Sequence, residues 1–397
     1  MDKPAICGGK PIRGTKIFYG HQYIDDADIQ AVVEVLKSDY LTCGPKIEEL
    51  EKKLCAVTGA KYAVVCSNGT AALHMACQAA GIGAGDEMIT TPITFAASAN
   101  CALYCGAKPV FADINEETYN IDPAHVESLT TEKTKAVVAV DYTGQSVELD
   151  RLLAHCRKHN LVLIEDGAHV IGTSYNGKKN GSIADMTTLS FHPVKTVTGG
   201  EGGAVLTNSE EYYQKLLLYR SHGITKNPAK MEHEPDGPWY YEQVALGMNY
   251  RMTDMQAALI ISQLDKLPLF MKRRKEIVKA YDEAFSKLPQ LFVQKEIPQS
   301  DTTRHLYILR IIPEKLKIDR KQFFEALAAE NICCQVHYIP VYYFPYYEKL
   351  GYQKGLCPKA EKLYEEEISL PLYYAMTDQD VDDVIQAVTK IVEYFKR

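Results

Sequence analysis

The chain has 397 residues, of which 46% are hydrophobic and 24% charged, and its formal net charge is −7. This length exceeds the roughly 250–300 residues at which one hydrophobic core stops growing, so two domains are expected. The negative charge, without a basic tail, argues against binding to nucleic acid or to a membrane surface. We also expect no transmembrane helix, because no apolar run approaches ~18 residues, and no signal peptide at Met1–Gly9.

The eleven cysteines form no framework that the sequence makes visible. Cys333 and Cys334 are adjacent, whereas metal and redox motifs separate their cysteines by two residues. No Cys/His cluster has the spacing of a zinc site. We therefore expect reduced thiols, no metal, and a cytoplasmic protein.

Helical and strand-like segments alternate through the first half of the chain. Apolar spacing predicts helices at 25–36, 48–58, 71–80, 96–104 and 149–158. Short apolar runs predict strands at 62–66, 87–91, 109–113, 136–141, 162–166, 187–191 and 203–207. This alternation predicts an α/β fold whose mostly parallel central sheet is covered by helices. Ligands of such a sheet bind at the carboxyl ends of its strands.

The pattern changes after Arg251. Long helices are predicted at 255–266, 270–288, 321–330 and 378–395, with strands at 306–310 and 334–338. We assign an N-terminal segment and a large domain to residues 1–266, and a smaller C-terminal α+β domain to residues 267–397.

Lys195 follows a predicted strand and precedes a glycine-rich stretch, Gly199–Gly203. A lysine beside glycines is usually a solvated loop residue, and this stretch is not a P-loop because no Gly-Lys-Ser/Thr follows. Upstream, the apolar strand 162–166 ends in Asp166. A lysine amine and a strand-end carboxylate are what pyridoxal phosphate requires: the amine attaches the cofactor and the acid keeps its ring nitrogen protonated.

Three further features fit the same cofactor. The segment Ser67–Thr70 lies at a strand-to-helix turn, where Gly69 and Thr70 could bind a phosphate, although an ordinary helix cap has the same pattern. Phe95 could stack on a planar ring or belong to the core. His169 could contact the cofactor's phenolic oxygen or be a structural histidine. Each signal is weak alone, and their order along the chain is what favours a common site.

These residues resemble the DegT/DnrJ/EryC1-type nucleotide-sugar aminotransferases, pyridoxal-phosphate enzymes of fold type I, over nearly the whole chain. The matching segments are Leu41–Pro45, Ser67–Leu73, Glu165–His169, Ser190–Lys195, Gly200–Gly203, Gly247–Asp254, Gln335–Tyr338 and Ser369–Pro371. Some relatives are dehydratases with histidine in place of the lysine, so Lys195 favours aminotransfer.

Within the family, the chain looks closest to the branch of pseudaminic acid biosynthesis, on the segments Ile89–Asn100 and Val140–Glu148. That branch forms UDP-4-amino-4,6-dideoxy-N-acetyl-β-L-altrosamine from a UDP-linked 4-keto-6-deoxy-N-acetylhexosamine, with L-glutamate as the amino donor. The N-terminal segment Met1–Ile17 is a departure, because it is longer than that branch implies.

The resemblance also implies roles for individual residues. Lys195 and Asp166 would be catalytic. The cofactor would be held by Gly69, Thr70, Phe95, Asp166, His169, Ser190, Lys195 and, from a second subunit, Asn249, which implies a homodimer with composite sites. The sugar nucleotide would contact Tyr19, Asp39, Tyr40, Leu41, Thr42, His337, Tyr338, Ile339, Pro340 and Val341. Arg251 would face the UDP phosphates or the glutamate carboxylate, or form a structural ion pair.

Two rival functions stay open at this point. One is aminotransfer to another nucleotide-linked keto sugar, such as a dTDP- or GDP-hexose. The other is a non-catalytic regulatory protein on the same fold. Lys195, Asp166 and the Ser67–Thr70 turn argue against a regulator, which has no chemical need for all three.

Overall fold

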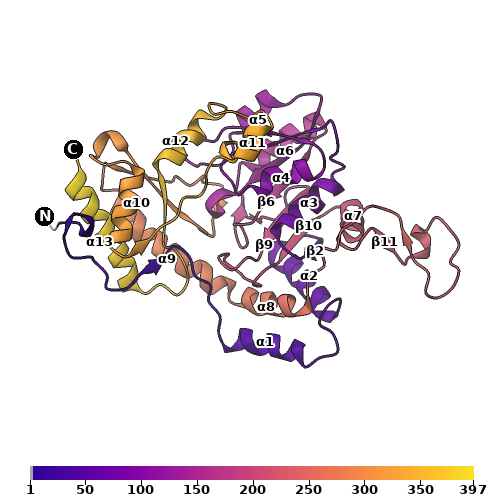
Figure 1. The fold of residues 1–397 in the computed structure, drawn as a ribbon. Coiled ribbons are helices and arrows are strands. Elements are labelled where there is room, and N and C mark those ends of the chain that lie inside the picture. The colour runs from indigo at the N-terminus through magenta and orange to yellow at the C-terminus, as the bar shows by residue number, and fades with distance from the viewer. Residues whose placement is uncertain (1–2) are drawn as a thin grey trace.

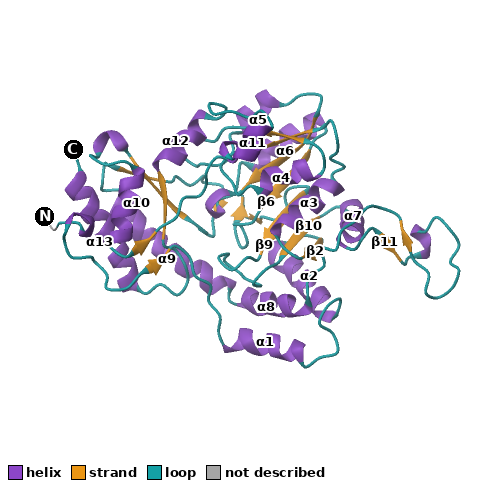
Figure 2. Ribbon diagram, in the orientation of Figure 1, coloured by secondary structure: helices purple, strands orange, loops and turns teal. Residues whose placement is uncertain are grey.

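The computed structural model describes residues 3–397 and has two layered regions (Figures 1 and 2). Its helices are α1 (Asp26–Leu36), α2 (Pro45–Thr58), α3 (Gly69–Ala79), α4 (Ala97–Tyr104), α5 (Pro123–Leu129), α6 (Leu149–His159), α7 (Glu210–Arg220), α8 (Asp254–Asp265), α9 (Leu267–Phe285), α10 (Arg320–Ala329), α11 (Pro345–Lys349), α12 (Pro358–Glu366) and α13 (Asp378–Phe395). No helix within residues 3–397 is long and apolar enough to cross a membrane.

A seven-stranded sheet organises the larger region. Its strands are β2 (Tyr62–Cys66), β3 (Glu87–Thr90), β4 (Lys108–Phe111), β5 (Thr134–Val140), β6 (Val162–Asp166), β9 (Met186–Ser190) and β10 (Gly203–Thr207). The spatial order is β2-β10-β9-β6-β5-β3-β4, and only β10 runs antiparallel to its neighbours. The predicted α/β fold with a mostly parallel sheet is therefore confirmed.

Helices cover both faces of this sheet because its strands are apolar on both sides. On one face α3, α4 and α7 pack against residues such as Val64 and Val138. On the other, α2 and α8 cover β2 and β10, while α6 covers β5 and β6. This burial on both faces leaves the strand ends as the places where polar side chains can gather.

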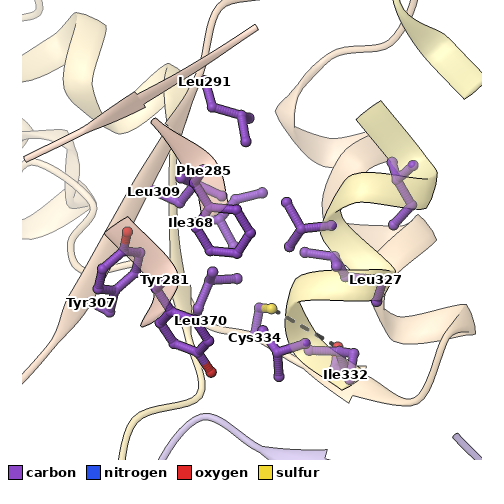
Figure 3. Packing of buried hydrophobic residues seen from close by; sticks show 14 of the residues in the cluster. Tyr281, Phe285, Leu291, Tyr307, Leu309, Leu327, Ile332, Cys334, Ile368 and Leu370 are labelled. Atoms are coloured by element: carbon purple, nitrogen blue, oxygen red, sulfur yellow. Dashed lines mark hydrogen bonds between the residues drawn. The ribbon is translucent and has the colours of Figure 1, made fainter. Parts of the chain in front are cut away.

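The smaller region has a three-stranded antiparallel sheet of β13 (Leu291–Val293), β15 (Tyr307–Ile311) and β17 (Glu367–Leu370), in the order β13-β15-β17. Helices α9, α10 and α13 bury it, and Figure 3 shows Phe285 of α9 packed among Leu309, Ile368 and Leu327. Short strands complete the chain: β1 (Ile17–Phe18), β7 (Ser174–Tyr175), β8 (Lys178–Lys179), β11 (Ile224–Thr225), β12 (Glu242–Gln243), β14 (Ser300–Asp301) and β16 (Ile332–Cys333).

The predicted strand at 334–338 and the N-terminal segment both belong to the surroundings of the smaller region. The predicted strand at 334–338 is wrong: pairing stops at Cys333, Gln335 makes one isolated bridge to Ser369, and the chain then turns. The N-terminal segment lies against the smaller region rather than the large sheet, because Ile17 pairs with Ile332 and enters that region's core. The division at residue 266 stays a prediction.

Candidate active site

A large cavity, of about 940 Å³, opens at the carboxyl ends of the parallel strands. Asp166 is the last residue of β6, and its neighbour in β9 is Thr188. Lys195 lies on the loop between β9 and β10, and it lines the same cavity. The sheet topology thus brings together an amine and a carboxylate that are 29 positions apart in the sequence.

The cavity wall near Ser190 is the start of α3. Asn68 caps this helix, its side chain accepting a hydrogen bond from the Ala71 N–H at 2.8 Å. A Cβ on Gly69 would lie 3.0 Å from the Ser190 Cβ, so glycine allows the helix to approach the end of β9 this closely. Gly69 and Thr70 therefore present a helix N-terminus to the cavity, which favours an anionic group.

Asp166 is held at both carboxylate oxygens. The Ser98 hydroxyl donates to Oδ2 at 2.6 Å, and the Ala168 N–H donates to Oδ1 at 3.2 Å. Burial raises the pKa of Asp166, while these two donors and the Lys195 ammonium lower it. A carboxylate oriented in this way can hold a proton on a ring nitrogen placed before it.

Lys195 has an altered pKa as well. Burial lowers the pKa of its amine to about 8, and the negative charge of Asp166 partly opposes this shift. More of the amine is uncharged near neutral pH than for an exposed lysine, and the uncharged form is the nucleophile.

An aromatic wall closes another side of the cavity. The rings of Tyr19 and His337 lie with centroids 5.2 Å apart, and Phe95 lies 6.5 Å from Tyr338. All four line the cavity. Phe95 is 64% exposed, so it is a rim residue rather than part of the core.

Several residues named by the resemblance do not line this cavity. His169 is buried, with its ring centroid 4.4 Å from that of His305. Its Nδ1 has no hydrogen-bond partner within residues 3–397, so the atom is free for a group that the described chain does not supply. Val341 packs in an apolar cluster, with its N–H donating to the Pro92 carbonyl. Ile339 is exposed and Pro340 is buried, both outside the cavity lining.

The remaining predicted residues gather elsewhere. Asp39, Tyr40, Leu41 and Thr42 are exposed, and Thr42 pairs with Thr253 just before α8. Arg251 lines a second cavity of about 280 Å³, together with Cys43 and Gly44, which follow that loop. Asn249 is exposed, although its neighbours Met248 and Tyr250 line the large cavity.

Sequence reasoning missed Ser98, His305 and the pair His74 and Tyr250. Ser98 sits in the first turn of α4, where an apolar run of small residues conceals it. The His74 Nδ1 and Tyr250 hydroxyl hydrogen-bond at 2.9 Å inside the large cavity. No spacing rule links residues so far apart in the chain.

Replacing Ser98 by alanine is expected to weaken cofactor binding. The Ser98→Ala change removes a hydrogen bond to Asp166 and raises its pKa further, because one of the groups that lower it is lost. A hydrogen bond to a charged group is worth on the order of 1.5 kcal/mol, so affinity should fall by about tenfold. Fluorescence titration of the cofactor-free protein measures this. Ser98→Thr, which keeps the hydroxyl, should restore most of the affinity, and an unchanged affinity in Ser98→Ala would remove Ser98 from the site.

The comparisons with known proteins agree with this geometry. The model of the DegT/DnrJ/EryC1/StrS aminotransferase family matches residues 22–389. The chain is 43% identical over 377 residues to the spore coat polysaccharide biosynthesis protein SpsC of Bacillus subtilis, covering 94% of this chain and 97% of that protein. It is 39% identical over 384 residues to the UDP-4-amino-4,6-dideoxy-N-acetyl-beta-L-altrosamine transaminase of Campylobacter jejuni, covering 96% and 99%.

A solved structure supports the same relation. The PLP form of a proposed sugar aminotransferase from Streptococcus pneumoniae has a TM-score of 0.89 and 32% identity, and the match covers 96% of this chain and 99% of that one. A family model that spans most of the chain, relatives that align from end to end, and a cavity with a lysine and a carboxylate lead to one conclusion. The chain is an aminotransferase and belongs to the DegT/DnrJ/EryC1/StrS aminotransferase family.

Proposed function

We propose that this enzyme moves an amino group from L-glutamate, through pyridoxal phosphate, to C4 of a UDP-linked 4-keto-6-deoxy-N-acetylhexosamine. The product is UDP-4-amino-4,6-dideoxy-N-acetyl-β-L-altrosamine, as in the pseudaminic acid pathway. The observation that carries this proposal is the single cavity that contains Lys195, Asp166 and the N-terminus of α3. The transaminase from Campylobacter jejuni, 39% identical over nearly its full length, supports the choice of sugar.

The residues present fit the cofactor. Gly69, Thr70 and Ser190 would hold its phosphate at the start of α3, where backbone N–H groups and the helix dipole favour an anion. Phe95, at the rim, would cover one face of the ring. His169, which follows the cavity-lining residue Ala168, would approach the phenolic oxygen.

When bound, pyridoxal phosphate supplies an electron sink and carries the amino group from one substrate to the other. Asp166 would hold the proton on the ring nitrogen, oriented for this by Ser98 and Ala168. Lys195 would attach the cofactor and, once released, would move a proton between the substrate carbon and the cofactor's C4′. Tyr19, His337 and Tyr338 would contact the sugar nucleotide along the aromatic wall.

A panel of substrates tests the assignment. L-Glutamate is offered with UDP-, dTDP- and GDP-linked 4-keto sugars, and 2-oxoglutarate is measured while mass spectrometry and NMR identify the amino sugar. We expect turnover with the UDP-N-acetylhexosamine substrate. Turnover with only a dTDP- or GDP-hexose would contradict the assignment of a UDP-linked sugar, but it would still support an aminotransferase. No 2-oxoglutarate with any sugar would favour a regulatory protein.

We also propose a homodimer with composite active sites. The predicted contact residues include two separate groups: Tyr19, His337 and Tyr338 line the large cavity, whereas Arg251 lines the smaller one, and the exposed loop 39–42 directly precedes Cys43 and Gly44 of its lining. Both groups can serve one substrate if the second comes from a partner chain. The arm that carries β11 and β12 extends away from the body (Figure 1), and its surroundings expose Trp239 by 72% and Leu246 by 76%, as a surface covered by a second copy would.

Mixed dimers test this arrangement. If Asn249 completes the phosphate site of the partner, both Lys195→Ala and Asn249→Tyr are inactive alone. Chains unfolded and refolded together pair at random, and about a quarter of all sites then carry neither lesion. Activity should recover toward that fraction, with mass spectrometry confirming mixed dimers. Verified mixed dimers that stay inactive would make Asn249 a structural residue of its own subunit.

We place the enzyme in the cytoplasm. All eleven cysteines are free thiols in the structure, as expected in a reducing compartment. Its proposed substrates, a nucleotide sugar and glutamate, are metabolites of that compartment.

A further inference from the structure

The N-terminal segment is tied to a buried carboxylate at the end of α10. Glu330 is 0% exposed. The Ala5 N–H donates to its Oε1 and the Ile12 N–H to its Oε2, both at 2.8 Å. The Lys390 ammonium of α13, whose side chain is 8% exposed, lies 3.1 Å from the same carboxylate. Two backbone donors and one cation thus satisfy a charge that could not otherwise be buried.

Three more contacts, all at Arg13, hold the segment between these points and β1. The Arg13 guanidinium lies 2.8 Å from Asp380 and 2.6 Å from Asp383, both on α13. The Asn331 amide donates to the Arg13 carbonyl at 2.7 Å. We call residues 3–16 the strap, because they run across the smaller region and are bonded to it along their length.

The strap leads directly into the cavity wall. Residues 17–18 form β1, which pairs in parallel with β16 at 332–333. Tyr19 follows β1 at once, and His337 follows β16 by four residues. Their rings lie 5.2 Å apart in the large cavity. One pair of short strands, β1 and β16, therefore positions both Tyr19 and His337 in the cavity wall.

Glu330 is linked to both strands, β1 and β16, through the chain segments that precede them. It precedes the first residue of β16 by two positions, and it binds the strap that precedes β1. A two-residue pairing has little stability of its own, so its register depends on what anchors each strand. Beyond the strands, the Leu372 N–H donates to the Tyr19 carbonyl at 3.0 Å, and the His337 Nδ1 bonds the Ser369 hydroxyl at 2.7 Å.

We propose that Glu330 and the strap are a positioning device for the sugar-nucleotide side of the active site, acting through Tyr19 and His337. The proposal rests on the function proposed above. Asp166 ends β6 of the large sheet and Lys195 lies on the loop after β9, so their chemistry with glutamate does not depend on the strap. The sugar nucleotide, which is the larger substrate, would contact Tyr19 and His337, whose positions depend on the strap.

The test separates the two half-reactions. Glu330→Gln keeps the shape but directs an amide N–H₂ at a backbone donor and leaves Lys390 without its anion. We expect the half-reaction with L-glutamate, followed by absorbance, to stay within about twofold, while KM for the keto sugar rises about tenfold or more with a smaller change in kcat. Arg13→Ala, at the other anchor, should act in the same direction without altering the buried carboxylate.

Glu366→Gln is the matched control. Glu366 is an ion-pair partner of Arg310 in the same region, its side chain is 10% exposed, and its hydrogen bonds go to Arg310 rather than to the strap. Both half-reactions should be unchanged in this variant. A loss in both half-reactions of Glu330→Gln, or in neither, overturns the proposal.

A second measurement needs neither cofactor nor substrate. Amide hydrogen exchange of the cofactor-free protein should accelerate at residues 17–19 and 332–337 in Glu330→Gln, and not in Glu366→Gln. Unchanged exchange would overturn the claim that Glu330 holds these strands. If wild-type protein used no keto sugar, the proposed function and the sugar-specific role would both fall, while the exchange result would still decide the role of Glu330 in positioning.

Discussion

Lys195→Ala is expected to abolish turnover, by ~10⁴-fold or more, because one amine both attaches the cofactor and moves the proton. Lys195 is the lysine that lines the large cavity, and burial there lowers its pKa to about 8. Wild-type protein should be yellow, and borohydride should fix the cofactor to the peptide that contains Lys195. Release of 2-oxoglutarate and peptide mass spectrometry measure the two effects.

Two comparisons make this result specific. Lys178→Ala removes an exposed lysine of β8 and should leave activity and colour unchanged. The Lys195→Ala protein should still bind pyridoxamine phosphate, since Gly69, Thr70 and Ser190 remain. Wild-type activity in Lys195→Ala would show that the covalent link belongs to another residue.

Asp166→Asn is expected to slow aminotransfer by on the order of 10²–10⁴-fold while the fold and cofactor binding are largely kept. An amide has the shape of the carboxylate, but it cannot hold the proton on the ring nitrogen by charge. The Ser98 hydroxyl can still donate to the amide oxygen, so the local packing survives. Single-turnover rates with L-glutamate and with the keto sugar measure the loss.

Asp113→Asn provides the control for burial. Asp113 is as buried as Asp166, both 5% exposed, but its carboxylate accepts the N–H groups of Lys359 and Ala360 and lines no part of the large cavity. The Asp113→Asn change should lower the free energy of unfolding without changing the rate of aminotransfer per folded molecule. A rate within about threefold of wild type in Asp166→Asn, under about 1 kcal/mol in the barrier, would mean that another acid serves the ring nitrogen.

The local sequence pattern was sufficient to predict elements and site residues that depend on their neighbours in the chain. Strand-like runs at 162–166 and 187–191 correspond to β6 and β9, and the polar residues that end or follow them line one cavity. Parallel strands bring their carboxyl ends to one edge, so Asp166 and Lys195 could be predicted to meet. The helix at 71–80 was found as α3 for the same reason, since its capping residues are adjacent in the chain.

Pattern failed where a segment depends on a distant partner. Residues 334–338 have the apolar alternation of a strand, yet pairing ends at Cys333, because β1 offers only two residues to pair with. Helix α7 and strand β17 were missed: α7 has no clear apolar face, and β17 follows α12 directly, without a turn residue to separate the two elements.

The sequence by itself determined the α/β fold, the position of Lys195 after a strand, and the carboxylate that it faces, because each rests on periodicity or on the rule for strand ends. Only the tertiary structure decided that Ser98 orients Asp166, that His169 packs against His305, and that Tyr19 reaches the large cavity from a strap bound to Glu330. These contacts join residues from 68 to 325 positions apart. No local pattern encodes such pairs, since a hydrogen bond between distant segments exists only once the sheet and the smaller region have been packed together.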